Sequence, residues 1–248
     1  IKRDVPGAKI RFGRMDLGNL ASIGRFADEL GAEQGSLDIL INNAGVMTPP
    51  KRQVTSDGYE LQMGTNYLGH FALTARLFSL LKNGKQPRIV NLGSVAARSG
   101  AIDFSDLQAE RSYNAMTVYS QSKLACIMFA FEFSRRSKHA DWGIQSMAAH
   151  PGISRTDLLT NQADGRTISG MVRRTLPFLF QPVWQGALPT LYAATDPHAK
   201  DGGHYGPDRL GGSRGYPTEE KPPQQSQDPV VAARLWEISE ALTGVTFG

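Results

Sequence analysis

The sequence has little of what cross-links small proteins. Among its 248 residues there is one cysteine, Cys126, which excludes an intrachain disulfide and a metal cluster held by several cysteines. The five histidines show no HxH or HxxxH spacing, so we expect no metal site. A chain of this length buries enough surface to fold without such cross-links.

Long apolar runs and blocks of like charge are also absent. The longest apolar run, Leu124 to Phe131, is far shorter than the roughly 20 residues that cross a bilayer. Lys and Arg (27) outnumber Asp and Glu (23) by only four, without a run of five basic residues, so the charge does not indicate nucleic-acid binding. The sequence predicts a cytoplasmic protein without a membrane span and without a nucleic-acid partner.

Strand and helix patterns alternate along the first 150 residues. A helical pattern follows Asn19, a suitable N-cap, and stops at Gly31. Strand patterns cover residues 9–16, 37–41, 88–92 and 144–149, and further helix patterns cover residues 58–81 and 117–138. This alternation predicts an α/β fold with a doubly wound, mostly parallel sheet in a single domain.

The pattern is less regular after Pro151. Residues 154–182 hold an apolar cluster, which is either core or a lid over an apolar substrate. Helices are expected at about 185–194, despite Pro189, and at about 230–242, with a Gly- and Pro-rich loop over 201–229 between them. The apolar stretch from Ala125 to Phe133 is either core or a subunit interface, so the sequence leaves open whether the protein forms a homo-oligomer.

Four places combine residues that could carry chemistry. Tyr119 and Lys123 lie four apart, on one face of a helix, where a lysine ammonium favours the phenolate form of a tyrosine. By itself this spacing is most often structural. Ser94, after the strand at 88–92, is either a cap or a hydrogen-bond donor to a substrate oxygen.

The other two places are a small-residue turn and an asparagine within a helix. Residues 42–45, NNAG, follow a strand, where a ligand can approach the backbone closely in an open α/β sheet. The alternative is an ordinary tight turn. Asn66 is a poor helix former, and it either holds a water molecule or only packs.

Taken in order, these features resemble the short-chain dehydrogenase/reductase family. The matching segments are Asp16-Leu17, NNAG at 42–45, TNYLGHF at 65–71, Ser94, YSQSK at 119–123 and HPG at 150–152, followed by Thr156. The region between Ser94 and Tyr119 is similar to the retinol-dehydrogenase-like and protochlorophyllide-reductase-like branch. Departures are Gly93, where this branch usually has serine, and Ala97-Arg98, where it often has Ala-His.

The resemblance implies a role for each matching residue. Tyr119 would be the acid/base and also contact the cofactor, Lys123 would bind the nicotinamide ribose and lower the tyrosine pKa, and Ser94 would hold the substrate oxygen. Asn66 would hold the water of a proton relay. The remaining cofactor-binding residues would be Asp16 and Leu17 at the adenine, Asn42, Ala44 and Gly45 along the cofactor, and Pro151, Gly152, Ile153 and Thr156 at its nicotinamide end.

One family feature is not found. The Gly-rich turn TGxxxGxG, which holds the cofactor pyrophosphate at a helix N-terminus, does not occur in this sequence. Because the first residue is Ile1 rather than Met, we expect that the N-terminal part is missing, about 45–60 residues comprising two strands and two helices.

The function implied is the interconversion of an alcohol and a carbonyl on an apolar substrate by hydride transfer. NADP(H) is favoured in this branch, and NAD(H) is the alternative. Two other functions stay open: a nucleotide-sensing or scaffold protein without turnover, and an epimerase or dehydratase of the extended type, which shares the YxxxK spacing.

Overall fold

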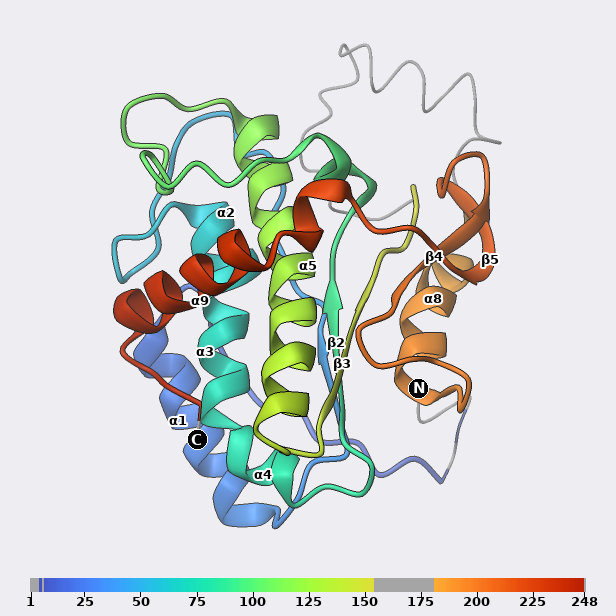
Figure 1. The fold of residues 1–248 in the computed structure, drawn as a ribbon. Helices are drawn as coiled ribbons and strands as arrows, with labels where there is room; N and C mark the ends of the chain where they lie inside the picture. Colours follow the sequence, from blue (N-terminus) through green and yellow to red (C-terminus); the bar gives the residue numbers. More distant parts are fainter. Residues whose placement is uncertain (1–4, 6, 154–180, 248) are drawn as a thin grey trace.

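In the computed structural model, five strands form one sheet in the order β1-β2-β3-β4-β5 (Figure 1). The structure describes residue 5, residues 7–153 and residues 181–247. The first four strands run parallel, and the last is antiparallel to its neighbour. The strands are β1 (Ile39–Asn42), β2 (Arg88–Leu92), β3 (Gln145–Ala149), β4 (His204–Arg209) and β5 (Arg214–Glu219). The expected α/β fold is confirmed.

Helices cover both faces of this sheet. The side chains of β2 alternate between two cores, with Ile89 on one face and Val90 and Leu92 on the other. One face carries α1 (Leu20–Glu33), α3 (Gly69–Arg76), α4 (Phe78–Lys82), α5 (Ala115–His139) and α9 (Pro229–Thr243), and the other carries α8 (Val183–Thr195) (Figure 1). Strands β2 and β3 have both faces covered, and all their residues but the first are buried.

The helix expected over residues 58–81 is divided. It consists of α2 (Leu61–Met63), a π-helical turn η1 (Gly64–Leu68), α3 and α4. A π-helical turn inserts one residue into the helical ladder and frequently occurs at functional sites. Asn66 lies in this turn, so its weak helix propensity coincides with the interruption.

The prediction of a loop over residues 201–229 is wrong for much of this segment. It contains β4, β5 and the short 3₁₀ helix η4 (Gln224–Gln227). Pairing of β4 with β3 buries Tyr205 completely, and such burial outweighs the poor strand propensity of Gly and Pro. Pro217 lies on β5, whose only partner among the described residues is β4, and proline is tolerated on such a strand.

The strand expected over residues 9–16 is also not formed: the chain there pairs with no strand in the part of the molecule that is described. It leads into α1, and Asn19 caps that helix as expected, because its side chain accepts a hydrogen bond from Ser22 N.

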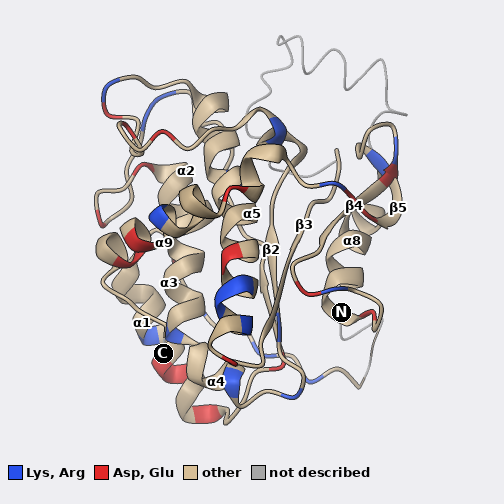
Figure 2. Ribbon diagram, in the orientation of Figure 1, with Lys and Arg blue, Asp and Glu red and all other residues tan. Residues whose placement is uncertain are grey.

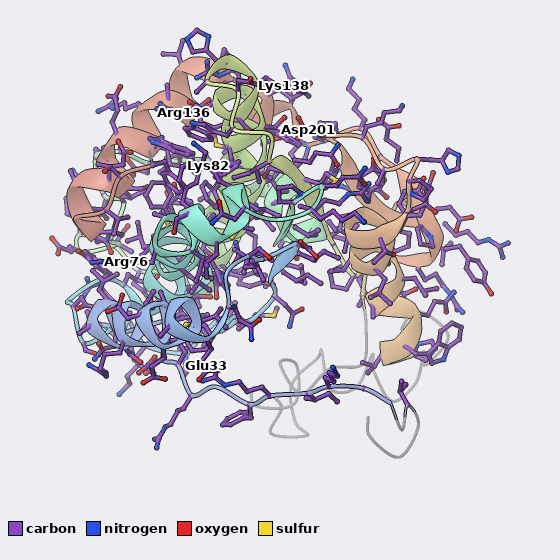
Figure 3. All side chains as sticks on the ribbon, turned by 90° about the horizontal axis from the view of Figure 1, so that it is seen from below. Glu33, Arg76, Lys82, Arg136, Lys138 and Asp201 are labelled. Atoms are coloured by element: carbon purple, nitrogen blue, oxygen red, sulfur yellow. The ribbon has the colours of Figure 1, made fainter. Side chains whose placement is uncertain are left out.

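Charged side chains gather away from the interior strands. Apart from Arg88 at the start of β2, strands β2 and β3 carry no charged residue (Figure 2). Viewed from the amino ends of the parallel strands, charged residues surround the helix ends (Figure 3). The basic ones among them are Arg76, Lys82, Arg136 and Lys138. Basic residues in the last turn of a helix interact favourably with the partial negative charge at its C-terminus.

Helix α9 covers the apolar half of α5. Phe129 and Phe133 are almost fully buried, and their rings lie 5.7 and 6.2 Å from that of Trp236. Asp228 caps α9, and Gly244, with φ of 66°, ends it. Of the two roles left open for residues 125–133, core or subunit interface, the structure therefore gives the core.

Candidate functional site

The candidate site lies at the carboxyl ends of β1, β2 and β3. These strands are parallel and in register, so Asn42, Leu92 and Ala149 end at one edge of the sheet. Ligands of open α/β sheets bind at this edge. The N-terminal half of α5 lies at the same end of the molecule (Figure 1).

Tyr119 and Lys123 lie one turn apart on α5, and both are buried, with 5% and 6% of their surfaces exposed. The Lys123 Nζ donates to Leu92 O at 3.1 Å. An ammonium group has three donors, so it can donate to further acceptors at the end of β2. Burial of a lysine is costly, and it is found where the charge has a specific use or partner.

Asn66 joins three segments of this site. Its Oδ1 accepts from Val46 N at 2.7 Å, and its Nδ2 donates to Val46 O and to Ser122 Oγ, both at 3.0 Å. The Ser122 hydroxyl in turn donates to Tyr119 O at 2.8 Å. The asparagine therefore holds the residues after β1 against the turn of α5 that carries Tyr119 and Lys123.

The backbone carbonyl of Asn66 also has protein partners. It lies 2.9 Å from His70 Nδ1 and accepts from Cys126 Sγ at 3.0 Å. Burial lowers the pKa of His70 to about 4 and raises the pKa of the Cys126 thiol. Both groups are therefore neutral at neutral pH, and the carbonyl freed by the π-helical turn is bonded within the core.

Ser94 caps the 3₁₀ helix η2 (Val95–Ser99), because its Oγ accepts from Ala96 N at 3.2 Å. The cap uses one lone pair of the hydroxyl and leaves its O–H free to donate elsewhere. This helix packs on the N-terminal half of α5, since Ser99 Oγ lies 3.5 Å from Ser120 Oγ. Both roles considered for Ser94, cap and donor, are therefore compatible with its position.

The NNAG turn divides into a structural and an open part. The Asn42 side chain is buried and donates to Thr74 Oγ1 at 3.1 Å and to Asn91 Oδ1 at 2.8 Å. Ala44 is exposed. A Cβ at Gly45 would lie 2.9 Å from Asn66 Oδ1 and 3.4 Å from Lys123 Nζ, so only glycine lets the turn approach these side chains so closely.

The loop after β3 is fixed by hydrogen bonds. Gly152 N donates to His150 Nδ1 at 3.2 Å, and Ile153 N donates to Ser213 O at 2.7 Å. Gln181 N donates to Ile153 O at 3.0 Å, and its side chain bonds Pro151 O. Thr156 and the lid expected over 154–182 lie outside the described residues, except for Gln181 and Pro182.

Asp16 and Leu17 lie before α1. Asp16 is exposed, and its Oδ1 accepts from Gly18 N at 2.8 Å, whereas Leu17 is buried in the core. The Asp16 backbone N–H donates to Ser22 Oγ at 3.0 Å.

A hollow of about 320 Å³ opens at this edge of the sheet. It is lined by Ile41, Asn43, Leu92, Pro151, Val183, Gly186, Ala187, Thr190 and Leu191. The lining is mostly apolar and comes from the ends of β1 and β2, the loop after β3 and α8. The part of the chain described here contains no group of His, Cys, Asp and Glu that could hold a metal ion, and no helix in it could span a membrane.

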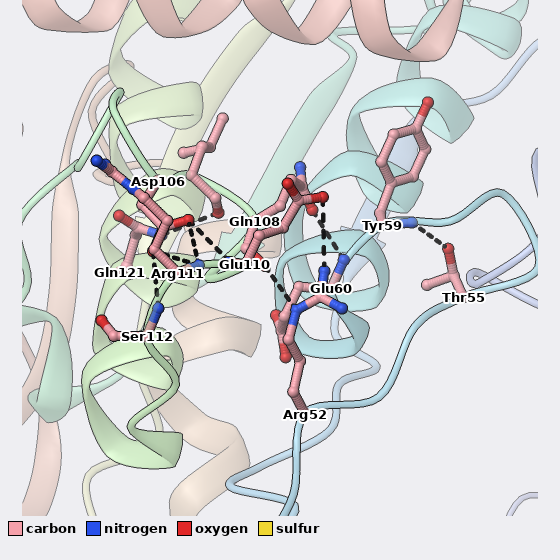
Figure 4. Close-up of polar contacts among 11 residues, drawn as sticks. Arg52, Thr55, Tyr59, Glu60, Asp106, Gln108, Glu110, Arg111, Ser112 and Gln121 are labelled. Carbon is pink, nitrogen blue, oxygen red and sulfur yellow. Dashed lines mark hydrogen bonds and ion pairs between the residues drawn. The ribbon is translucent and has the colours of Figure 1, made fainter.

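The sequence analysis did not predict the residues that hold the long loop between Ser94 and Tyr119. Gln121 lies between Tyr119 and Lys123, accepts from Asp103 N at 2.8 Å and donates to Leu107 O at 3.2 Å. Gln108 Oε1 accepts from Glu60 N at 2.8 Å (Figure 4). Burial raises the pKa of Glu60, which caps α2.

These contacts explain the spacing of 25 residues between Ser94 and Tyr119. The insertion folds onto the segment before α2 and leaves both ends near α5. A signal for it was present in the sequence, since the polar residues 120–123 directly precede the apolar run 124–131 of the same helix.

Comparison with known proteins agrees with this geometry. The family model for short chain dehydrogenase matches residues 1–167. Retinol dehydrogenase 14 of Mus musculus is 37% identical over 245 residues, covering 93% of this chain and 66% of that protein. Retinol dehydrogenase 13 of Homo sapiens is 39% identical over 235 residues, covering 93% and 68%. The chain belongs to the short-chain dehydrogenase family and spans about two thirds of the length of these relatives.

Two solved structures are similar to it. A crystal structure of an uncharacterised protein from Mycobacterium paratuberculosis has a TM-score of 0.74 and 36% identity, covering 94% of this chain and 75% of that one. A blue fluorescent protein from a metagenomic library, in complex with NADPH, has a TM-score of 0.58 and 25% identity, covering 81% and 75%.

Proposed function

We propose that this protein is an NAD(P)-dependent oxidoreductase that interconverts an alcohol and a carbonyl group on an apolar substrate. The observation that carries the proposal is the buried pair Tyr119 and Lys123, one turn apart beside the end of β2. The retinol dehydrogenases among its relatives support an alcohol or aldehyde on a long apolar molecule as substrate.

The residues at the strand ends fit the nicotinamide end of such a cofactor. The apolar hollow bounded by Leu92 and Pro151 suits a nicotinamide ring, and Lys123 offers donors for ribose hydroxyls. The sequence has no Gly-rich turn for the pyrophosphate. We favour NADP(H) over NAD(H), as in the NADPH-bound neighbour.

When bound, the cofactor would supply or accept the hydride at the substrate carbon. Tyr119 would donate its hydroxyl proton to the substrate oxygen during reduction and take it back during oxidation. Ser94 would donate a hydrogen bond to the same oxygen and orient it. Lys123 would donate to the ribose hydroxyls of the cofactor one helical turn away from Tyr119.

The contacts of Asn66 support a positioning role more directly than the water-holding role expected from the resemblance. Its amide and its carbonyl all have partners in the protein. It would thereby fix Gly45 and the Tyr119 turn relative to one another.

The test is turnover by the purified full-length protein with NADPH or NADH and a series of apolar aldehydes and ketones that includes retinal. We expect Tyr119→Phe to lower kcat by about 10²–10⁴-fold, with cofactor affinity retained. The control is Tyr216→Phe, because Tyr216 is exposed on β5. An unchanged kcat for Tyr119→Phe would refute the proposal, and cofactor binding without turnover would favour a nucleotide sensor.

We also propose a cytoplasmic location. Fractionation of cells that express the full-length protein would test it: recovery with membranes would contradict a cytoplasmic location.

A further inference from the structure

A partly buried cluster formed by Glu220, His150 and Arg98 joins the β4–β5 hairpin to both loops of the candidate site. Glu220, directly after β5, accepts through one oxygen, Oε2, from His150 Nε2 at 2.8 Å and from Arg98 Nη2 at 3.3 Å. Its own backbone N–H donates to His204 O at 2.8 Å. Arg98 also donates to Gly211 O at 2.6 Å.

The hydrogen bonds assign the protonation of the cluster. His150 Nδ1 accepts from Gly152 N, so the ring proton is on Nε2 and points to the glutamate. Although burial alone would raise the pKa of Glu220, the bond from His150 and the charge of Arg98 lower it. Glu220 is therefore an ionised acceptor that faces a donor from each of two loops.

The close approach of the hairpin is built into the sequence. A Cβ at Gly206 would lie 2.3 Å from His150 Nε2, and one at Gly212, where φ is 80°, would lie 2.5 Å from Glu220 Oε1 and 2.7 Å from Arg98 Nη2. The space that the cluster occupies exists only because these two positions lack side chains.

Each partner of Glu220 lies next to a residue of the candidate site. Arg98 belongs to η2, the helix that Ser94 caps. His150 holds Gly152 N in the loop that lines the hollow with Pro151. A chain of hydrogen bonds therefore connects η2, which Ser94 caps, to the loop after β3. It runs from Arg98 through Glu220 and His150 to Gly152.

We propose that Glu220 is a positioning residue, which fixes the turn bearing Ser94 and the loop at 150–153 relative to one another by binding Arg98 and His150 together. The proposal rests on the proposed function, because it assigns these loops to substrate and cofactor. It also gives a use to Arg98, the residue that departs from the common Ala-His of the branch.

The experiment compares two neighbouring glutamates. Glu220→Gln keeps the shape and removes the charge, and the control Glu219→Gln removes a charge from the exposed ion pair with Lys200. Per folded molecule, we expect kcat/KM to fall about 10–100-fold for Glu220→Gln, since small misplacements of reacting groups have effects of this size. Glu219→Gln should stay within about twofold of wild type, as expected for a surface pair.

A second set of three variants guards against misfolding. Arg98 is 44% exposed, so its substitution leaves the core intact. Arg98→Met should lose activity as Glu220→Gln does, Arg98→Lys should recover part of it, and the double variant Arg98→Met, Glu220→Gln should be no worse than the more damaged single variant. Strictly additive losses, or losses that vanish when rates are divided by the folded fraction, would overturn the proposal.

Hydrogen exchange gives a readout that needs no turnover. The amide of Gly152 should exchange faster in Glu220→Gln than in wild type or Glu219→Gln, because its acceptor, His150 Nδ1, is no longer held. Unchanged exchange would refute the role of Glu220. If wild type shows no turnover but the exchange changes as expected, the proposed function fails while the coupling of the two loops stands.

Discussion

Both halves of α5 contain buried side chains, but these side chains differ in their chemistry. In the first half, Ser122 accepts from Asn66 of η1 and donates to Tyr119 O, and Lys123 donates to Leu92 O at the end of β2. In the second half, Phe129 and Phe133 pack among aromatic rings under α9. Burial by itself therefore does not distinguish a site from a core: the partners of the buried side chains do.

This difference also separates activity from stability. A buried polar group with specific partners fixes geometry and contributes modestly to net stability. A buried aromatic ring contributes much more, because it removes a large apolar area from water. Substitutions in the first half should therefore change rates, and substitutions in the second half should change the free energy of unfolding.

The largest expected effect is the loss of activity on substitution of Lys123, and Lys138 of the same helix provides the control. Lys123→Met should lower kcat by about 10²-fold or more and weaken cofactor binding by about 10–100-fold, the size of a lost charge-assisted hydrogen bond. Lys138→Met, which breaks an exposed contact with Asp201 in the second half, should change neither. Steady-state kinetics and cofactor titration measure both effects. Normal cofactor affinity in Lys123→Met would show that Lys123 does not bind the cofactor ribose.

The reverse result is expected for the aromatic half. Phe129→Ala should lower the free energy of unfolding by about 3–5 kcal/mol through loss of burial and creation of a cavity. Met116→Ala, at an exposed position of the same helix, should cost well under about 1 kcal/mol. Urea denaturation measures both variants. If the folded fraction of Phe129→Ala had lost its kcat, the separation of the two halves would be wrong.

We expect protonation of His70, which contacts the Asn66 carbonyl, to lower the stability of the protein at acid pH. Its pKa is about 4 in the folded protein and about 6.5 in an unfolded chain, so the unfolded state binds the proton first. The contribution of neutral His70 to the free energy of unfolding is fully present above pH 6.5. It should fall by about 3 kcal/mol as the pH drops from 6.5 to 4. Buried His204, also with a pKa of about 4, adds to this loss, and Glu60 opposes it.

Denaturation curves at several pH values test this coupling. His70→Gln should flatten the dependence between pH 6.5 and 4, whereas His139→Gln, at the exposed end of α5, should leave it as in wild type. A wild-type slope that survives in His70→Gln would mean that His70 does not carry this part of the pH dependence.

Sequence reasoning identified the polar half of α5 because its signals are local. Tyr119 and Lys123 have a fixed helical spacing, and β2 and β3 are short apolar runs that needed no tertiary information. The hairpin of β4 and β5 was missed because Gly and Pro obscure its pattern, and its pairing with β3 depends on residues more than 50 positions away. The Glu220 cluster was missed for the same reason, since Arg98, His150 and Glu220 come from separate loops.

The contacts of Asn66 show a subtler limit. Its position in the helix signalled an interruption, but its partners at Val46, Ser122 and Cys126 follow from the packing of three elements. A residue type indicates which bonds a side chain can make, and only the fold decides which partners it meets.

The smallest effect provides the sharpest comparison between the halves of α5. Ser122 donates to Tyr119 O and accepts from Asn66, and Ser134 donates to Asp201 Oδ2 at 2.8 Å. Both are buried serines on one helix, so Ser122→Ala and Ser134→Ala should each cost about 1 kcal/mol of stability. Only Ser122→Ala should also lower kcat/KM, because it releases Asn66 from the turn that carries Tyr119 and Lys123. Equal rates in the two variants would show that the bond between Ser122 and Asn66 stabilises the helix without positioning the site.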